Sequence, residues 1–162
     1  MHATPILTIE TAENLIKALE DFLEHSEASF ALIIDRGGAV LSQHGQIPPA
    51  MDTTIFSALA AGSYAATREL ALRVGETEFS ALHQQGKRSQ ILISSINDNA
   101  VLASVFGPKT TLGLVRFYSA SAVKRIATLL EKASRDSRIP IEIGREITDG
   151  LQEVFHEPSR RA

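Results

Sequence analysis

Cysteine is absent from the 162 residues of this chain. Its absence excludes disulfides, thiolate nucleophiles and cysteine-ligated zinc sites. An excess of positive charge is also missing, because 16 basic residues stand against 19 acidic ones and form no stripe along the sequence. Proteins that bind nucleic acid normally carry a basic field that captures phosphates, so we expect no nucleic-acid partner.

Long hydrophobic runs are lacking as well. No apolar run reaches the roughly 18 residues that a membrane helix needs, so we expect no membrane insertion. Residues 1–25 hold five acidic side chains among their apolar ones, which leaves no hydrophobic core for a signal peptide. The sequence therefore predicts a cytoplasmic protein.

Motifs for nucleotide binding and catalysis are not found either. Residues 86–89 (GKRS) superficially resemble a phosphate-binding loop, but Ala81 stands where that loop needs a glycine and Arg88 where it needs Ser or Thr. The histidines are His2, His25, His44, His83 and His156, and none pairs with another at the i+2 to i+4 spacing of metal ligands. We interpret His83 as a strand residue at a sheet edge or in an interface. We expect no catalytic residue, no metal and no cofactor.

The chain has the composition of an ordinary soluble globule, with 44% hydrophobic and 22% charged residues. A chain of this length buries enough apolar surface for one core without disulfides or metals. We therefore predict one domain over residues 1–134, a linker over 135–146, where the helical periodicity is lost, and a C-terminal tail over 147–162.

The apolar periodicity predicts the element order α-β-β-α-β-β-β-α. A first helix follows Thr8 or Thr11, and its apolar stripe consists of Leu15, Ile16, Leu19, Phe22 and Leu23. Strands are expected over 30–34, 39–43, 78–84, 89–96 and 100–106, a middle helix over 53–74 behind Asp52, and a last helix behind Thr110 or Thr111. Strands joined by hairpins with inserted helices indicate an α+β fold, in which a five-stranded antiparallel sheet carries helices on both faces.

The tail carries a second, short apolar stripe at helical spacing. Its members are Ile147, Leu151, Val154 and Phe155, and Thr148 or Asp149 is suited to cap it. An isolated helix of this length is marginal in water. We therefore predict an amphipathic C-terminal helix that docks on its own domain or on a partner.

The middle helix has two faces without the usual surface charges. We assign one face to the sheet; it consists of Phe56, Leu59, Ser63, Ala66, Leu70 and Val74. The second face consists of Thr54, Ala58, Ala61, Ala65, Arg68 and Leu72, with Gly62 and Glu69 beside it. An exposed helix surface is normally rich in Glu, Lys, Gln and Arg, whereas this one carries small side chains for about two turns.

Gly62 is the informative residue of this second face. Glycine inside a helix costs roughly 1 kcal/mol relative to alanine. The high helix propensity of alanine accounts for Ala58, Ala61 and Ala65, but it accounts neither for Gly62 nor for the missing charges. Small side chains let another backbone approach closely and lose little rotamer entropy when covered, so we predict that this face is an interface.

Several segments together resemble a known family. Residues 31–41, the Ala- and Gly-rich helix 52–75, and residues 101–106 and 112–116 are similar to the roadblock/dynein-light-chain domain family, over about residues 10–134. The segments 52–54, 61–62, 75–79 and 111–116, and the tail residues 146–149 with Leu151 and Phe155, resemble the MglB branch of bacterial gliding-motility proteins.

The resemblance implies a homodimer joined through the middle helices, with the two sheets continuing edge to edge. It implies that this dimer is a GTPase-activating protein for a Ras-like small GTPase of the MglA type, which controls cell polarity and motility. It also implies that the dimer stabilises the partner's switch segments without an arginine finger, while the C-terminal helix docks on the GTPase and tunes activation or nucleotide exchange. The interface residues would be Thr54, Ala58, Ala61, Gly62 and Ala65, with Arg68, Glu69 and Arg73 at the rim.

Two alternatives stay open. The first is a scaffold or adaptor that binds a small GTPase or a motor complex without stimulating hydrolysis. The second is a ligand-binding sensor or an enzyme, and it requires a cavity in which several polar groups converge.

Overall fold

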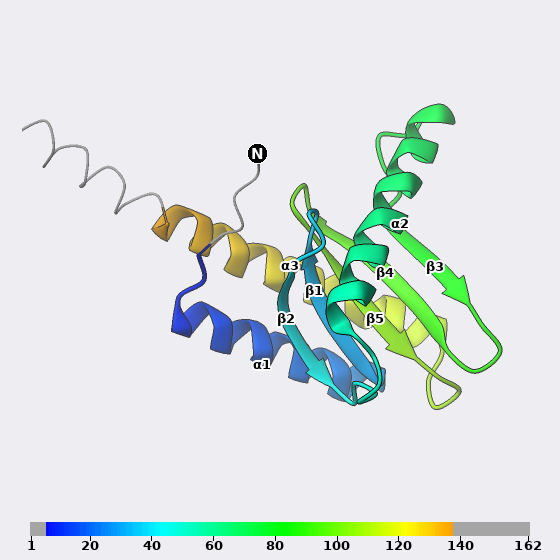
Figure 1. Ribbon diagram of the computed structural model, residues 1–162, viewed down its shortest axis with the longest axis horizontal. Helices are drawn as coiled ribbons and strands as arrows, with labels where there is room; N and C mark the ends of the chain where they lie inside the picture. The colour runs from blue at the N-terminus through cyan, green and yellow to red at the C-terminus, as the bar shows by residue number, and fades with distance from the viewer. Residues whose placement is uncertain (1–5, 138–162) are drawn as a thin grey trace, which may run out of the picture.

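The computed structural model describes residues 6–137. Their elements follow the predicted order (Figure 1): α1 (Ile9–Ser26), β1 (Phe30–Asp35), β2 (Val40–Gly45), α2 (Thr53–Arg73), β3 (Ala81–Gln85), β4 (Gln90–Asn97), β5 (Ala100–Phe106) and α3 (Leu112–Asp136). The strands form one antiparallel sheet in the order β2-β1-β5-β4-β3. The predicted α+β fold with a five-stranded antiparallel sheet is confirmed.

Strand β1 lies inside the sheet and contributes to two hydrophobic cores. It pairs with β2 on one side and with β5 on the other. Ala31 and Ile33 belong to the larger core with α1 and α3, whereas Leu32 and Ile34 belong to the smaller core with α2. All four side chains are fully buried, which explains why the strand is apolar over 30–34 instead of alternating.

Helices α1 and α3 cover one face of the sheet and α2 covers the other (Figure 1). The two helices run antiparallel, because Glu10 near the start of α1 pairs with Lys132 near the end of α3. The predicted stripe of α1 is confirmed at Leu15 but is wrong at Ile16, which is 39% exposed. Ile16 lies at the margin of the stripe and turns toward solvent, and Ala18 is buried in the core.

Each helix begins at a residue that the sequence marks as a cap. Thr8, Asp52 and Thr111 are the N-caps, and the side-chain oxygen of each accepts a hydrogen bond from a backbone N–H of the first turn. Such caps satisfy donors that have no partner within the helix. The predicted starts of the helices are thus confirmed.

The turn between β1 and β2 is tied to α2. Gly38 has a φ of 89°, in the left-handed region that favours glycine. A Cβ at this position would lie 2.9 Å from the Cα of Ala58, so the neighbouring helix also excludes a side chain there. The buried hydroxyl of Ser57 donates a hydrogen bond of 2.6 Å to the carbonyl oxygen of Gly38. The turn therefore fixes the first half of α2 against the sheet.

Helix α3 continues to Asp136, so it includes the first part of the segment predicted as a linker. The rest of that segment and the tail stripe (Ile147, Leu151, Val154 and Phe155) lie outside the described residues. Within residues 6–137, no helix is both long enough and apolar enough to cross a membrane.

Candidate partner-binding surface

Helix α2 contacts the sheet mostly through small side chains. Its buried residues are Ser57, Ala60, Ala61, Tyr64 and Ala71. Ala60, Ala61 and Tyr64 pack in the smaller core with residues of β1, β4 and β5. Small side chains let the helix lie close to the sheet, and Tyr64 adds a large aromatic contact with a polar end.

The Tyr64 side chain also joins α2 to the chain that follows it. Its hydroxyl donates a hydrogen bond of 2.9 Å to the carbonyl oxygen of Phe79, just before β3. Burial raises the pKa of the Tyr64 hydroxyl, and the nearby carboxylate of Glu78 raises it further, against an opposing hydrogen bond with Ser95. Tyr64 therefore stays neutral and acts as a structural link.

The sheet-facing residues of α2 differ from those that the sequence predicted. Leu59, Leu70 and Val74 are 66%, 62% and 70% exposed, and Ala66 is exposed as well. Phe56 does pack, half-buried, against the smaller core. The prediction is wrong for two reasons. Helix α2 is apolar on more than one side, so the apolar periodicity does not show which side faces the sheet. The prediction then placed the large apolar side chains against the sheet, because such side chains are normally buried.

The face of α2 turned away from the sheet is therefore rich in apolar surface. Ile55, Leu59, Leu70 and Leu72 are each more than half exposed, as is Val74 directly after the helix. Exposed patches of this kind mark interaction sites in soluble proteins. Ile55 was not among the predicted interface residues. The sequence does hold a signal for it, because a helix that is apolar on all sides must leave some large apolar side chains exposed.

Most of the predicted interface residues lie on this outward face. Thr54, Ala58, Gly62, Ala65, Glu69 and Arg73 are exposed, and Arg68 is half-buried. Ala61 contradicts the prediction, because it is 9% exposed and packs in the smaller core. It stands one turn after Ser57 and one turn before Tyr64, and the hydrogen bonds of these two residues direct that side of the helix toward the sheet.

Gly62 lies on the outward face without a structural need for glycine. A Cβ built at this position would meet no atom within 4 Å. An alanine there would stabilise the helix by about 1 kcal/mol. No contact within the described residues therefore offsets the loss of helix stability that this glycine causes.

An apolar groove of about 440 Å³ opens beside the first turns of α2. The residues that line it include Phe30, Met51, Phe56, Ile91 and Val105, together with Gln84 and Gln85 of the edge strand β3. Phe30 and Phe56 belong to the smaller core or pack against it, so the groove lies on the same side of the sheet as α2. It extends the apolar surface beyond the helix.

Reactive side chains do not gather near this surface. Within residues 6–137, no group of three or more potential metal ligands comes together, and the ion pairs connect α1 with α3 and with β2. His83 lies half-buried in β3, where its Nε2 is 2.8 Å from Oε1 of Gln90. Its predicted place at a sheet edge is confirmed.

Comparisons with known proteins agree with this architecture. The model of the Roadblock/LC7 domain family matches residues 16–106. A structure of MglB in a tetrameric arrangement is 29% identical, with a TM-score of 0.77, and the match covers 82% of this chain and 99% of that chain. The gliding protein MglB of Thermus thermophilus is 29% identical, with a TM-score of 0.76 and the same coverage. MglB of Myxococcus xanthus is 26% identical, with a TM-score of 0.72, covering 79% of this chain and 96% of that chain.

Among curated protein sequences, none matches this chain.

Proposed function

Because the chain belongs to the Roadblock/LC7 domain family, whose members are regulatory domains and not a family of enzymes, we propose that it regulates a small GTPase. It forms a homodimer in the cytoplasm, binds a Ras-like GTPase of the MglA type and accelerates GTP hydrolysis, and in this way it controls cell polarity and gliding motility. The similarity to MglB of Thermus thermophilus and of Myxococcus xanthus supports this proposal.

The outward face of α2 is the observation that carries the proposal. It combines exposed large side chains such as Leu59 and Leu70 with a smooth segment that contains Gly62 and Ala65. Covering such a face removes apolar surface from water at little cost in side-chain entropy. A second backbone that packs at Gly62 would account for this glycine, because a side chain there would hold the two backbones apart.

A protein without catalytic residues is able to accelerate GTP hydrolysis in a partner. Phosphoryl transfer depends on the positioning of the attacking water and on stabilisation of charge, and both depend on the order of the GTPase switch segments. A dimer that holds those segments in their productive arrangement therefore raises the rate without an arginine finger. In this proposal Arg68, Glu69 and Arg73 act at the rim, where charges set encounter rate and partner choice.

The tail contributes to the same complex. Its stripe (Ile147, Leu151, Val154 and Phe155) docks on the GTPase away from the nucleotide and tunes activation or exchange. A chain truncated after Ser137 is expected to bind the GTPase more weakly while its domain stays folded.

Single-turnover GTP hydrolysis with an MglA-type GTPase tests the proposal. We expect the full-length chain to raise the hydrolysis rate above the intrinsic rate, and we expect Ala65→Arg to abolish this effect. Ala120→Arg is the matched control, because Ala120 is also an exposed helical alanine but lies on α3, across the sheet. Circular dichroism shows whether both variants are folded, and sedimentation shows whether they are dimers.

The outcomes separate the candidate functions. Acceleration that Ala65→Arg removes and Ala120→Arg leaves supports the activating role of the α2 face. Binding without acceleration contradicts activation and indicates a scaffold. A folded Ala65→Arg variant that still accelerates hydrolysis shows that the partner binds elsewhere.

A further inference from the structure

The groove beside the first turns of α2 ends at the hairpin between β3 and β4, and we call it the hairpin groove. Four of the apolar side chains that line it are only half-buried: Met51, Phe56, Ile91 and Val105. Gln84 and Gln85 of β3 form its border at the edge of the sheet. The hairpin groove therefore presents apolar surface to solvent, and a partner that covers it removes this surface from water.

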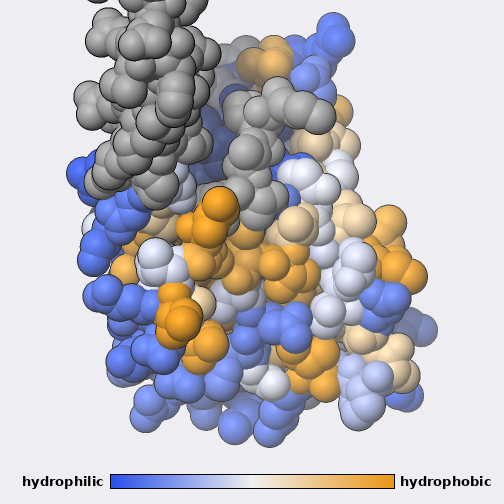
Figure 2. All heavy atoms as spheres, turned by 60° about the vertical axis from the view of Figure 1, so that its left-hand side comes forward, coloured by the Kyte–Doolittle hydropathy of each residue, from blue (hydrophilic) through white to orange (hydrophobic). Residues whose placement is uncertain are grey.

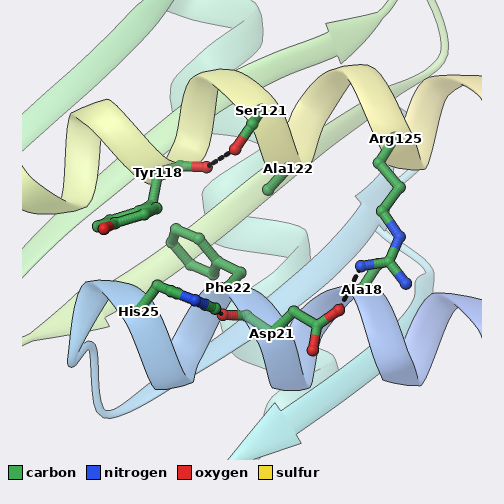
Figure 3. A pocket seen from close by; sticks show the side chains of 8 residues that line it. All are labelled: Ala18, Asp21, Phe22, His25, Tyr118, Ser121, Ala122 and Arg125. Carbon is green, nitrogen blue, oxygen red and sulfur yellow. Dashed lines mark hydrogen bonds and ion pairs between the residues drawn. The ribbon is translucent and has the colours of Figure 1, made fainter.

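The surface formed by α1 and α3, on the other side of the sheet, differs from the hairpin groove. Between these helices the side chains of Ala18, Phe22 and Ala122 are buried, and Arg125 pairs with Asp21 at the rim (Figure 3). On the side of the molecule that lies to the left in Figure 1, hydrophobic residues reach the surface among hydrophilic ones (Figure 2). Of these surfaces, the hairpin groove is the one that combines a hollow with open apolar side chains.

Strand β3 lies at the edge of the sheet next to the hairpin groove. Within residues 6–137 it pairs with β4 alone, so the backbone groups on its outer side have no strand partner. An open edge of this kind is able to pair with the same strand of a second copy. A two-fold axis perpendicular to the sheet makes that pairing antiparallel and leaves the α2 helices of both copies on the same side.

The two ends of β3 have different neighbours. The end of α2 lies near the start of β3, because only residues 74–80 connect them and the hydroxyl of Tyr64 bonds to the carbonyl oxygen of Phe79 (Figure 1). The hairpin groove lies beside the end of β3, at Gln84 and Gln85. Antiparallel pairing places the start of one strand against the end of the other. It therefore brings the end of α2 in each copy to the hairpin groove of the other.

The end of α2 carries apolar side chains that suit this groove. Leu70 and Val74 are both mostly exposed. They follow Phe56 by about four and five helical turns, so all three side chains lie on one side of the helix. Phe56 lines the hairpin groove, which β3 borders, so this side of α2 is turned toward the open edge of the sheet. Leu70 and Val74 are thus directed toward the second copy.

Charges of opposite sign accompany the two surfaces. Residues 84–89, around the hairpin, contain Lys87 and Arg88 and no carboxylate, whereas residues 74–80, after α2, contain Glu76 and Glu78 and no basic residue. All four side chains are exposed, and within residues 6–137 none of them takes part in an ion pair. The pairing that brings the end of α2 to the groove also brings these opposite charges together, twice in each dimer.

We propose that Leu70 and Val74 of each copy lie in the hairpin groove of the other, with Glu76 and Glu78 of one copy facing Lys87 and Arg88 of its partner. This inference rests on the homodimer of the proposed function. Pairing of edge strands alone selects poorly among partners, whereas this contact requires matched apolar and charged groups at both ends of β3. The contact therefore makes a second copy of this chain the preferred partner.

The absence of cysteine makes the contact measurable by disulfide formation. Val74→Cys in one chain and Gln84→Cys in another place thiols on its two sides, and mild oxidation of the mixture is expected to give disulfide-linked dimers. The matched control replaces Val74→Cys by Ala58→Cys, which is also exposed but lies about 24 Å away along α2. We expect the first pair to react about tenfold faster or more.

Reversal of the charges tests the same contact independently. Lys87→Glu/Arg88→Glu and Glu76→Lys/Glu78→Lys should each raise the Kd of the homodimer about tenfold, because each puts like charges on both sides of the contact. An equimolar mixture of the two variants should recover the original affinity as a heterodimer, in which both contacts again join opposite charges. Sedimentation measures these affinities.

Lys17→Glu/Lys124→Glu is the matched control for the charge reversal, because it makes the same change at exposed sites on α1 and α3. It should leave the Kd of the homodimer unchanged.

Three results would overturn the contact: equal disulfide rates for the two cysteine pairs, charge reversals no stronger than their control, and no recovery in the mixture. None of these measurements needs a GTPase. Dimers that lack the contact and still accelerate GTP hydrolysis overturn this inference and leave the activating role standing. Dimers that show the contact without accelerating hydrolysis contradict the activating role alone.

Discussion

At the scale of single residues, Tyr64 connects the candidate surface to the sheet. Its ring is buried under α2 and its hydroxyl bonds to the carbonyl of Phe79, so one side chain fixes both the rotation of the helix and the approach to β3. Two features make its ionisation costly, namely burial and the neighbouring carboxylate of Glu78.

The stability of the fold should accordingly fall at alkaline pH. Because burial raises the pKa of Tyr64 in the folded state, the unfolded chain loses the hydroxyl proton first, near pH 10. The contribution of Tyr64 is therefore complete below about pH 10 and is lost as the pH rises toward the folded-state pKa. Urea unfolding at pH 9 and above should show that the free energy of unfolding falls as the pH rises. This fall should be smaller in the Tyr64→Phe variant, which has no hydroxyl to ionise at this position.

The absorbance of tyrosinate gives an independent check. Tyr118→Phe leaves Tyr64 as the single tyrosine, since the chain has two. A titration midpoint of this variant at or below that of free tyrosine would contradict the shift.

Two glycines provide a contrast at the same scale. Gly38→Ala should destabilise the fold by about 1–3 kcal/mol, because the residue has a positive φ and its Cβ would press on Ala58. Within a single chain, Gly62→Ala should stabilise the fold by about 1 kcal/mol, because the added methyl meets open space and favours the helix. In the proposed dimer the same methyl should weaken association, because it separates the two backbones. Urea unfolding at a protein concentration at which sedimentation shows monomers measures both glycine variants. A loss of stability in monomeric Gly62→Ala would show that the single chain does need this glycine.

At the scale of elements, the sequence predicts most of the secondary structure because each segment carries its own signals. Caps at Asp52 and Thr111 mark where helices begin, and the apolar run of β1 marks a strand covered on both faces. The rotation of α2 about its own axis is not predictable in this way. Which side of α2 faces the sheet depends on tertiary contacts such as the hydrogen bonds of Ser57 and Tyr64, which link residues far apart in the sequence.

The rotation of α2 is testable by two equal changes in side-chain volume. Ala61→Leu should destabilise the fold by about 1–3 kcal/mol, because Ala61 packs against the sheet and the larger side chain must displace its neighbours. Ala65→Leu should change the stability of the monomer by less than about 0.5 kcal/mol, because Ala65 is exposed in the single chain. Unfolding free energies that rank the two variants in the opposite order would contradict the observed rotation.

At the scale of the whole molecule, helix α3 ends later than the sequence suggests. The periodicity of α3 weakens after Ala133, yet the helix runs to Asp136, and Ser137 bonds to the segment that precedes α1. The helical stripe alone does not reveal this end, because the last turn is held by contacts with the N-terminal segment. Most of the predicted interface residues share one exposed face of α2, whereas the positions of Ala61 and Ile55 depend on the rotation of the helix.

Truncation measures where the domain ends. A chain that stops after Lys132 should be less stable than one that stops after Ser137 by about 1–3 kcal/mol, because it loses the fully buried Ala133 and the hydrogen bond to Ile6. Thermal unfolding of the two truncated chains gives the comparison. Equal midpoints would show that the last turn of α3 adds nothing to the fold.

The division of the interior by β1 has a consequence for dynamics. The two helices on one side share the larger core, whereas α2 rests alone on the other side, through small side chains that offer little area to hold it. Regions with few buried apolar contacts open most readily. The layer that we propose to meet other molecules is thus the one with the fewest contacts inside the protein. Binding of a partner to α2 should therefore make this layer more rigid.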